Sequence, residues 1–144
     1  MQVEFELVEE KAGEKALIKA VEKTKAIENA IEILEGAEDS IPVSKEGKTY
    51  LLKKNAIYYI ESVDKKTFIY TKTDCFESKD RLYELEESLG GFFARCSKAL
   101  IINLKKIKNV NSELGGRMNA TLLNDEIIVI SRSYVKEIKR RLEI

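Results

Sequence analysis

Between residues 43 and 130 the apolar residues of this chain occur in short runs that are rich in β-branched and aromatic side chains. Runs of this kind, with polar turn residues between them, are typical of β-strands and are too short for most helices. We therefore predict that this region forms mostly β-structure. The predicted strands lie at Val43 and at residues 50–52, 56–63, 68–73, 75–77, 92–96, 99–104, 107–111, 119–123 and 127–130.

Two short helices are predicted within and after this β-rich region. Leu82, Leu85 and Leu89 recur at helical spacing in residues 79–89, with Ser78 before them as the predicted N-cap and a glycine pair after them as the stop. Residues 131–142 follow the last predicted strand and are predicted to form a closing helix.

The first 40 residues have a different pattern. Residues 2–8 alternate polar and apolar side chains, which predicts a half-buried strand. Residues 14–35 carry apolar side chains at helical spacing, which predicts an amphipathic helix that ends at Gly36. Residues 37–42 break both patterns and contain the only proline, so we predict a linker there.

The distribution of charge supports a division into two parts. Residues 1–40 contain 5 Lys and Arg against 11 Asp and Glu, a net charge of −6, whereas residues 41–144 contain 20 against 14, a net charge of +6. We predict a strand–helix head, residues 1–40, and a main domain, residues 41–144, in an α+β chain that is mainly β. A basic main domain attracts polyanions such as nucleic acid, although ordinary solvated surface charge would give the same count.

Several absences restrict the chemistry of the chain. It has no histidine, which removes the commonest general base and the commonest transition-metal ligand. No phosphate-binding glycine loop, dinucleotide-binding glycine pattern or serine-nucleophile motif occurs. We therefore expect no enzymatic activity, no metal site and no cofactor. The two cysteines, Cys75 and Cys96, are expected to be reduced and packed as small apolar side chains, although a disulfide between them stays open.

The sequence also bears on where the protein resides. No apolar run approaches the ~20 residues that a membrane span needs, and the amino terminus lacks the pattern of a signal peptide. We expect a cytoplasmic protein without membrane insertion.

Basic and hydroxyl side chains gather at three predicted turns. Residues 64–67 present two lysines, residues 95–98 combine Arg, Ser and Lys, and Arg132 lies between two serines where the last helix begins. Side chains projected from such loops can reach the phosphates and base edges of duplex DNA. Two plainer interpretations stay open: the lysines are ordinary turn residues, and Arg132 forms a structural ion pair with Glu137.

Five motifs follow one another in a specific order: YYIES at 58–62, FIYT at 68–71, RLYELEESL at 81–89, FFARCSKALIINLKKI at 92–107 and LLNDEIIVISRSYVKEIKRRL at 122–142. In this combination the chain resembles the LytTR-type DNA-binding domain of bacterial transcription regulators, over about residues 42–144. The resemblance implies an antiparallel β fold of small sheets with short helices, and loops that enter successive major grooves of double-stranded DNA.

The resemblance also implies which side chains contact DNA. By motif, the base-contacting positions of the family fall on Thr67 with Lys66 beside it, on Lys98, and on Arg132. Three further side chains are expected to contact phosphates: Arg95, Ser97 and Lys136.

Two features depart from the common family pattern. Many members carry His-Arg or His-Asn where this chain has Ser97-Lys98, so the bases preferred at that point cannot be transferred. Only about 40 residues precede the main domain, fewer than a doubly wound receiver domain needs. The chain therefore resembles the short, stand-alone members, and we expect no receiver-domain phosphorylation.

The expected function is that of a sequence-specific, double-stranded-DNA-binding transcription regulator. The head is expected to mediate a homodimer, because its negative charge would repel phosphates and a strand with one helix is too small to form its own core. The alternative is a protein-interaction module that uses the strand–helix head, with an incidental basic face on the main domain.

Overall fold

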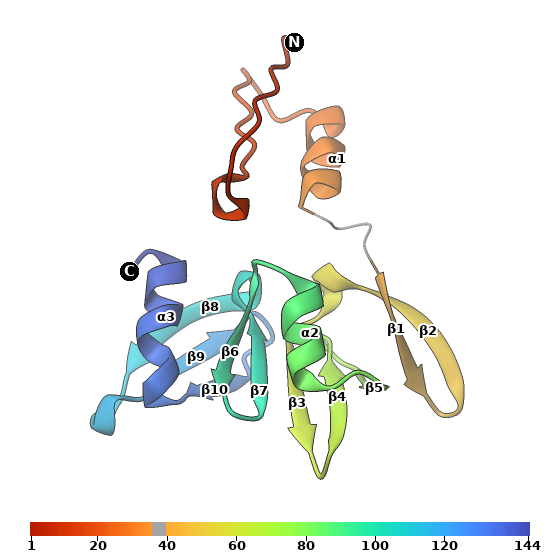
Figure 1. Ribbon diagram of the computed structural model, residues 1–144, viewed down its shortest axis with the longest axis vertical. Helices are drawn as coiled ribbons and strands as arrows, with labels where there is room; N and C mark the ends of the chain where they lie inside the picture. The colour runs from red at the N-terminus through yellow and green to blue at the C-terminus, as the bar shows by residue number, and fades with distance from the viewer. Residues whose placement is uncertain (36–39) are drawn as a thin grey trace. The chain divides into compact units, whose positions relative to one another are not determined.

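The structure, a computed structural model, describes residues 1–35 and 40–144 (Figure 1). The chain divides between Ala37 and Glu38 into two compact units, which are described separately. This division lies close to the predicted boundary between residues 40 and 41.

A seven-stranded antiparallel sheet forms most of the second unit. Its strand order is β2-β1-β5-β4-β3-β7-β6, so the β3–β4 and β6–β7 hairpins lie next to each other in the sheet. The strands are β1 (Ser40–Lys45), β2 (Lys48–Lys53), β3 (Tyr59–Val63), β4 (Lys66–Tyr70), β5 (Cys75–Ser78), β6 (Phe93–Ser97) and β7 (Leu100–Asn103).

A three-stranded antiparallel sheet, with the order β10-β9-β8, completes the β-structure. Short 3-10 turns connect several strands, and two α-helices pack on the sheets. The remaining elements of the second unit are β8 (Ile107–Ser112), β9 (Met118–Leu122), β10 (Ile127–Ile130), η2 (Lys54–Ala56), η3 (Leu104–Lys106), η4 (Leu114–Gly116), α2 (Leu82–Leu89) and α3 (Arg132–Leu142). The predicted fold class, mainly antiparallel β with short helices, is therefore confirmed.

The two helices of the second unit bury the side chains that the sequence pattern indicates. Leu82, Leu85 and Leu89 of α2 are all buried in one apolar cluster with the seven-stranded sheet. The helix begins later than predicted, because Ser78 remains in β5 and its hydroxyl accepts a hydrogen bond from the backbone N–H of Asp80 (3.1 Å). Ser78 thus closes a turn before the helix instead of capping it.

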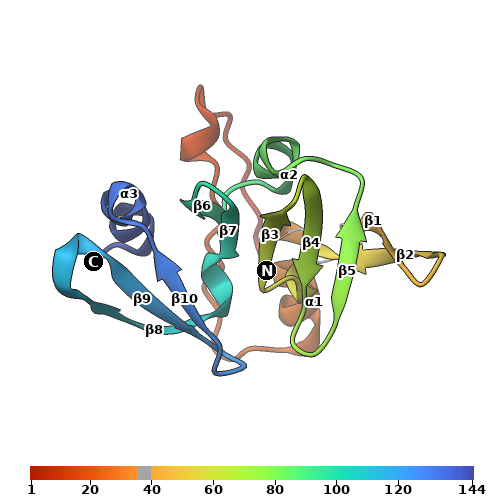
Figure 2. The same cartoon turned by 90° about the horizontal axis from the view of Figure 1, so that it is seen from below.

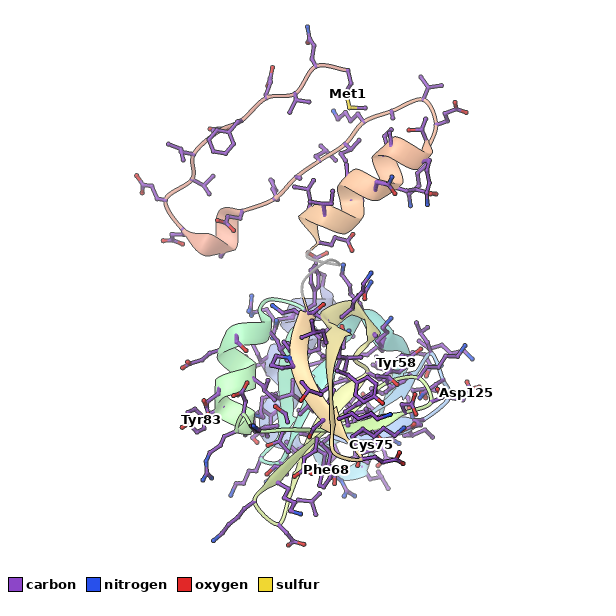
Figure 3. The ribbon with its side chains drawn as sticks, turned by 90° about the vertical axis from the view of Figure 1, so that its right-hand side faces the viewer. Met1, Tyr58, Phe68, Cys75, Tyr83 and Asp125 are labelled. Atoms are coloured by element: carbon purple, nitrogen blue, oxygen red, sulfur yellow. The ribbon has the colours of Figure 1, made fainter. Side chains whose placement is uncertain are left out.

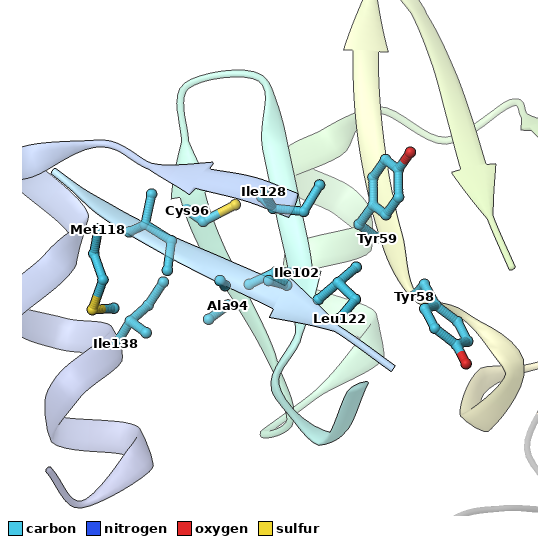
Figure 4. Close-up of a cluster of buried hydrophobic side chains, with 11 residues drawn as sticks. Tyr58, Tyr59, Ala94, Cys96, Ile102, Met118, Leu122, Ile128 and Ile138 are labelled. Carbon is cyan, nitrogen blue, oxygen red and sulfur yellow. The ribbon is translucent and has the colours of Figure 1, made fainter. Parts of the chain in front are cut away.

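A second apolar cluster joins the two sheets to α3. Side chains from β6, β7, β9, β10 and α3 meet in it, and Ile138 of α3 is fully buried (Figure 4). Full burial of an apolar side chain of this size typically contributes about 1.5–3 kcal/mol. This cluster fixes the start of α3 relative to the β6–β7 hairpin.

One partly buried tyrosine hydroxyl links the sheets. The Tyr59 hydroxyl on β3 donates a hydrogen bond to Glu126 Oε2, just before β10 (2.7 Å), and the Tyr59 ring stacks on Tyr70 with centroids 4.5 Å apart. Burial, together with the hydrogen bond to the Glu126 carboxylate, raises the pKa of the Tyr59 hydroxyl far above its usual value. The hydroxyl therefore remains a donor at any physiological pH.

The two cysteines are free and have different environments. Cys96 is buried, as predicted, and burial raises the pKa of its thiol to about 12. Cys75 is exposed, so the prediction of a buried side chain is wrong at this position. It is the first residue of β5 and is labelled in Figure 3.

The first unit differs from its predicted form. Residues 2–8 form no strand, and the side chain of Phe5 is 86% exposed. Alternation alone did not produce a strand here, because a strand needs a partner edge to satisfy its backbone groups. Of the described residues 1–35, none belongs to a strand.

The predicted long helix is also shorter. Helix α1 covers Lys25–Leu34, because the Thr24 side chain caps it by accepting a hydrogen bond from the Ile27 N–H (3.3 Å). Residues 14–24 are irregular, and a short 3-10 turn, η1 (Lys11–Gly13), precedes them. The predicted helix end at Gly36 lies outside the described residues. In the predicted linker at 37–42, residues 40–42 belong instead to β1 and the others lie outside the described residues.

None of the helices in residues 1–35 and 40–144 is long and apolar enough to cross a lipid bilayer.

Candidate nucleic-acid interface

Three of the segments singled out in the sequence lie along one side of the second unit. They are the β3–β4 turn, the β6–β7 turn and the start of α3, all at the lower side of this unit in Figure 1 and toward the viewer in Figure 2. Backbone hydrogen bonds join them: the Ser62 N–H donates to the Ala99 carbonyl (2.8 Å) and the Ser131 N–H to the Cys96 carbonyl (2.9 Å). The central hairpin therefore fixes the positions of the other two segments.

The β3–β4 turn presents lysines to solvent. Its central residues, Asp64 and Lys65, both have positive φ (49° and 68°), as a two-residue type I′ hairpin requires. Lys65 and Lys66 are exposed, but Thr67 is only 5% exposed because it lies inside β4, paired with Ser62 and Ser78 on either side. The burial of Thr67 argues against a direct base contact by this side chain and leaves the two lysines to reach a ligand.

The β6–β7 turn presents Lys98 from a braced backbone. The Ser97 hydroxyl accepts a hydrogen bond from the Ala99 N–H (3.3 Å) and so closes the turn. The Arg95 guanidinium donates through Nη1 to the Lys98 carbonyl (2.8 Å) and through Nε to Glu86 Oε2 on α2 (2.9 Å). Arg95 thus connects the turn to α2, while the Lys98 side chain is exposed.

The start of α3 presents Arg132. Its side chain is exposed and makes no hydrogen bond or ion pair with any residue in the described parts of the chain. Glu137 is instead bound by Arg140, with Nη2 2.6 Å from Oε1, and this contact lowers the pKa of the Glu137 carboxyl. The structural ion pair between Arg132 and Glu137 does not form. Lys136, one turn further along α3, is also exposed.

Gly116 lies directly against Arg132. A Cβ atom on Gly116 would be 2.8 Å from Cδ and 2.9 Å from Cγ of Arg132, closer than side-chain carbons approach each other. The aliphatic part of Arg132 therefore lies against the backbone of η4, and a side chain at residue 116 would displace it. The sequence offered only a glycine doublet at this place, which is ordinary in a hairpin.

Two further contacts were not evident from the sequence. Glu86 belongs to a run of acidic residues on α2 that is typical of a solvated surface, yet it binds Arg95. Arg141 donates to the backbone carbonyls of Phe93 (3.1 Å) and Gly91, so the end of α3 is attached to the beginning of β6. No local pattern reveals either contact, because each joins a helix to a different element, and the contact of Arg141 joins residues 48 apart in sequence.

Comparison with known proteins gives a consistent result. The family model described as the LytTr DNA-binding domain matches residues 47–143. The chain is 26% identical over 105 residues to the sensory transduction protein LytT of Enterococcus faecalis, covering 72% of this chain and 43% of that protein. It is 32% identical over 95 residues to an uncharacterised HTH-type transcriptional regulator of Staphylococcus aureus, covering 66% of this chain and 65% of that protein. The matched region thus spans less than two thirds of the length of these relatives.

A solved structure shares the fold. The LytTr DNA-binding domain of a Bacillus cereus response regulator superposes with a TM-score of 0.70, covering 74% of this chain and 98% of that domain, at 22% sequence identity. The fold of the second unit is therefore that of a LytTR domain. With residues 47–143 matched by the family model, this chain belongs to the LytTR DNA-binding domain family.

Proposed function

We propose that the second unit reads the sequence of double-stranded DNA from the side that carries the β3–β4 turn, the β6–β7 turn and the start of α3, and that the chain regulates transcription. The observation that carries this proposal is the joining of three cation-bearing segments by backbone hydrogen bonds. A rigid row of such segments can meet successive major grooves on one face of a duplex.

Each segment has a distinct role in this proposal. Arg132 donates to a base, because its guanidinium is exposed and unpaired, and Lys98 does so from the braced β6–β7 turn. Lys66 reaches the duplex from the β3–β4 turn, and the buried Thr67 supports that turn from beneath. Ser97 and Lys136 contact phosphates. Arg95 retains Nη2 for a phosphate, while its Nη1 binds the Lys98 carbonyl and its Nε binds Glu86.

The test begins with a pool of randomised duplexes, from which the wild-type chain selects its preferred sequence. The affinities of Arg132→Ala and Lys136→Ala are then measured on the selected duplex and on a scrambled one. A bidentate Arg–guanine contact typically contributes about 1–3 kcal/mol of discrimination, whereas a phosphate contact contributes none directly. We expect Arg132→Ala to lower the ratio of the two affinities and Lys136→Ala to weaken both equally. If the wild-type chain selects no sequence, the proposal is wrong.

A second role is favoured for the first unit by its exposed apolar side chains. The side chains of Val3, Phe5 and Leu7 are exposed. An open apolar hollow of about 610 Å³ is lined by Met1, Ile18 and parts of α1. The net charge of −6 on residues 1–40 makes contact with DNA unfavourable. We propose that this unit associates with the same unit of a second chain, giving a homodimer, and that the chain is not an enzyme.

A further inference from the structure

The loop between β8 and β9 carries an apolar side chain that does not pack in either apolar cluster. Leu114 is 94% exposed, and neither of the two apolar clusters includes it. The loop is closed by a hydrogen bond from the Glu113 N–H to the Arg117 carbonyl (2.8 Å), and Gly115 and Gly116 both have a φ of +83°. A single exposed leucine is common on protein surfaces, so its position decides whether it has a role.

The position of this loop, Glu113–Arg117, is beside Arg132. Gly116 contacts the aliphatic part of Arg132, and in Figure 1 the light-blue segment between β8 and β9 lies on the same lower side of the unit as the start of α3. The loop is therefore adjacent to the segment that is proposed to enter the major groove.

The charge of the loop also suits a duplex. Arg117 is exposed and adds a cation at its end. Glu113 is the acidic residue of the loop, and its carboxylate accepts a hydrogen bond from Asn119 Nδ2 (2.5 Å), so it is held against β9. The tip of the loop is therefore the apolar side chain of Leu114, and the loop lies next to Arg132.

We propose that this loop is a fourth DNA-contacting segment, in which Leu114 contacts a thymine methyl group next to the base read by Arg132 and Gly116 leaves room for the Arg132 side chain. The thymine methyl is the apolar group that a base pair presents in the major groove, and it is contacted by apolar side chains. The inference rests on the proposed function, because it requires the start of α3 to lie in that groove.

Leu114→Ala tests the contact, with Leu51→Ala as the matched control. Leu51 is 76% exposed on the edge strand β2, so both substitutions shorten an exposed leucine. On the selected duplex we expect Leu114→Ala to weaken binding by about three- to tenfold, from the apolar contact that is lost. We expect Leu51→Ala to bind as the wild-type chain does and both variants to keep the wild-type melting temperature.

Replacement of thymine by deoxyuridine identifies the group that is contacted. At one position of the selected duplex, the replacement should weaken binding by the wild-type chain by a similar factor. The same replacement should not weaken binding by Leu114→Ala any further, because both changes remove the same contact. If no thymine position shows this coupling, or if Leu114→Ala binds as Leu51→Ala does, the inference is wrong while the proposed function stands. If the wild-type chain selects no sequence, the proposed function itself fails.

Gly116→Ala tests the positioning of Arg132, and Gly115→Ala is its control. Both glycines have a φ of +83°, so an alanine strains the backbone at either position, but a Cβ on Gly115 meets no atom within 4 Å. We expect only Gly116→Ala to lower discrimination at the base pair that Arg132→Ala identifies. Equal loss of discrimination in the two variants would show that backbone strain, and not contact with Arg132, is responsible.

Discussion

At the scale of single residues, the candidate interface depends on side chains that hold other side chains in place. Arg95 is predicted from the family pattern as a phosphate contact, and the structure shows it bound to Glu86 and to the Lys98 carbonyl. An arginine with several planar donors can serve both purposes. The electrostatic effect of Glu86 and its positioning effect act in opposite directions, which makes them separable.

Glu86→Gln separates them. Removal of an acidic charge near DNA would by itself strengthen binding to every duplex. If Glu86 positions Arg95 and through it Lys98, Glu86→Gln instead lowers discrimination at the base pair that Lys98→Ala identifies. The expected change in folding free energy is below about 1 kcal/mol, because the pair is partly exposed. Affinity measurements on selected and scrambled duplexes distinguish the outcomes.

Glu87→Gln is the matched control. Glu87 is an exposed neighbour of Glu86 on α2, and its substitution removes the same charge. We expect it to strengthen binding slightly without changing discrimination. Identical behaviour of the two variants would contradict a positioning role for Glu86.

The sequence predicts some residues of the candidate site and not others. The family motifs predict Lys66, Lys98 and Arg132 as DNA-contacting residues, and all three side chains are exposed. The burial of Thr67 could not be predicted, because it depends on strands that flank β4 on both sides. The contact of Gly116 with Arg132 is likewise tertiary and leaves only a glycine in the sequence.

At the scale of elements, α3 carries both the interface and the end of the core. Its apolar face is anchored by Ile138, which is fully buried among residues of β6, β9 and β10. Its first residue is Arg132. The packing of one face therefore determines where the other presents its cations.

Ile138→Ala should destabilise the second unit. Truncation of a buried Ile to Ala typically costs about 2–5 kcal/mol, since it leaves a cavity in the core. We expect a loss of this size in the free energy of unfolding, measured with denaturant. Arg140→Ala, which removes an exposed ion pair on the same helix, should cost less than about 1 kcal/mol. A comparable loss in both variants would show that Ile138 does not anchor α3.

Local side-chain patterns are sufficient to predict a strand only where a partner strand lies beside it. In the second unit β-branched and aromatic runs became strands, because each run has a neighbouring strand to pair with. Residues 2–8 carry an equally clear alternation but form no strand. A pattern of side chains predicts which face would be buried, and it cannot supply the partner.

At the scale of the whole molecule, the two units have opposite charge and different surfaces. The proposed dimer joins the acidic first units, which would bring two DNA-binding units together and raise their local concentration on a two-site duplex. The competing arrangement is a monomer whose first unit packs against its own second unit.

Sedimentation of the full chain distinguishes these arrangements. We expect the wild-type chain to sediment as a dimer at micromolar concentration. Phe5→Glu should shift it toward monomer, because it places a charge in the proposed contact and adds to the negative charge already there. Leu51→Glu, an equally drastic change on an exposed leucine of the second unit, should leave the dimer intact. A wild-type chain that sediments as a monomer would contradict the proposed dimer.

The central claim is that one side of the second unit binds duplex DNA through its cations and recognises sequence. The measurement that tests it most directly is the affinity of the wild-type chain for its selected duplex and for a scrambled duplex over a range of salt concentrations. Each neutralised phosphate should contribute a slope of about −0.9 in the logarithm of affinity against the logarithm of salt concentration. We predict steep negative slopes for both duplexes and tighter binding of the selected one at every salt concentration. Slopes near zero, or equal affinities for the two duplexes, would contradict the account.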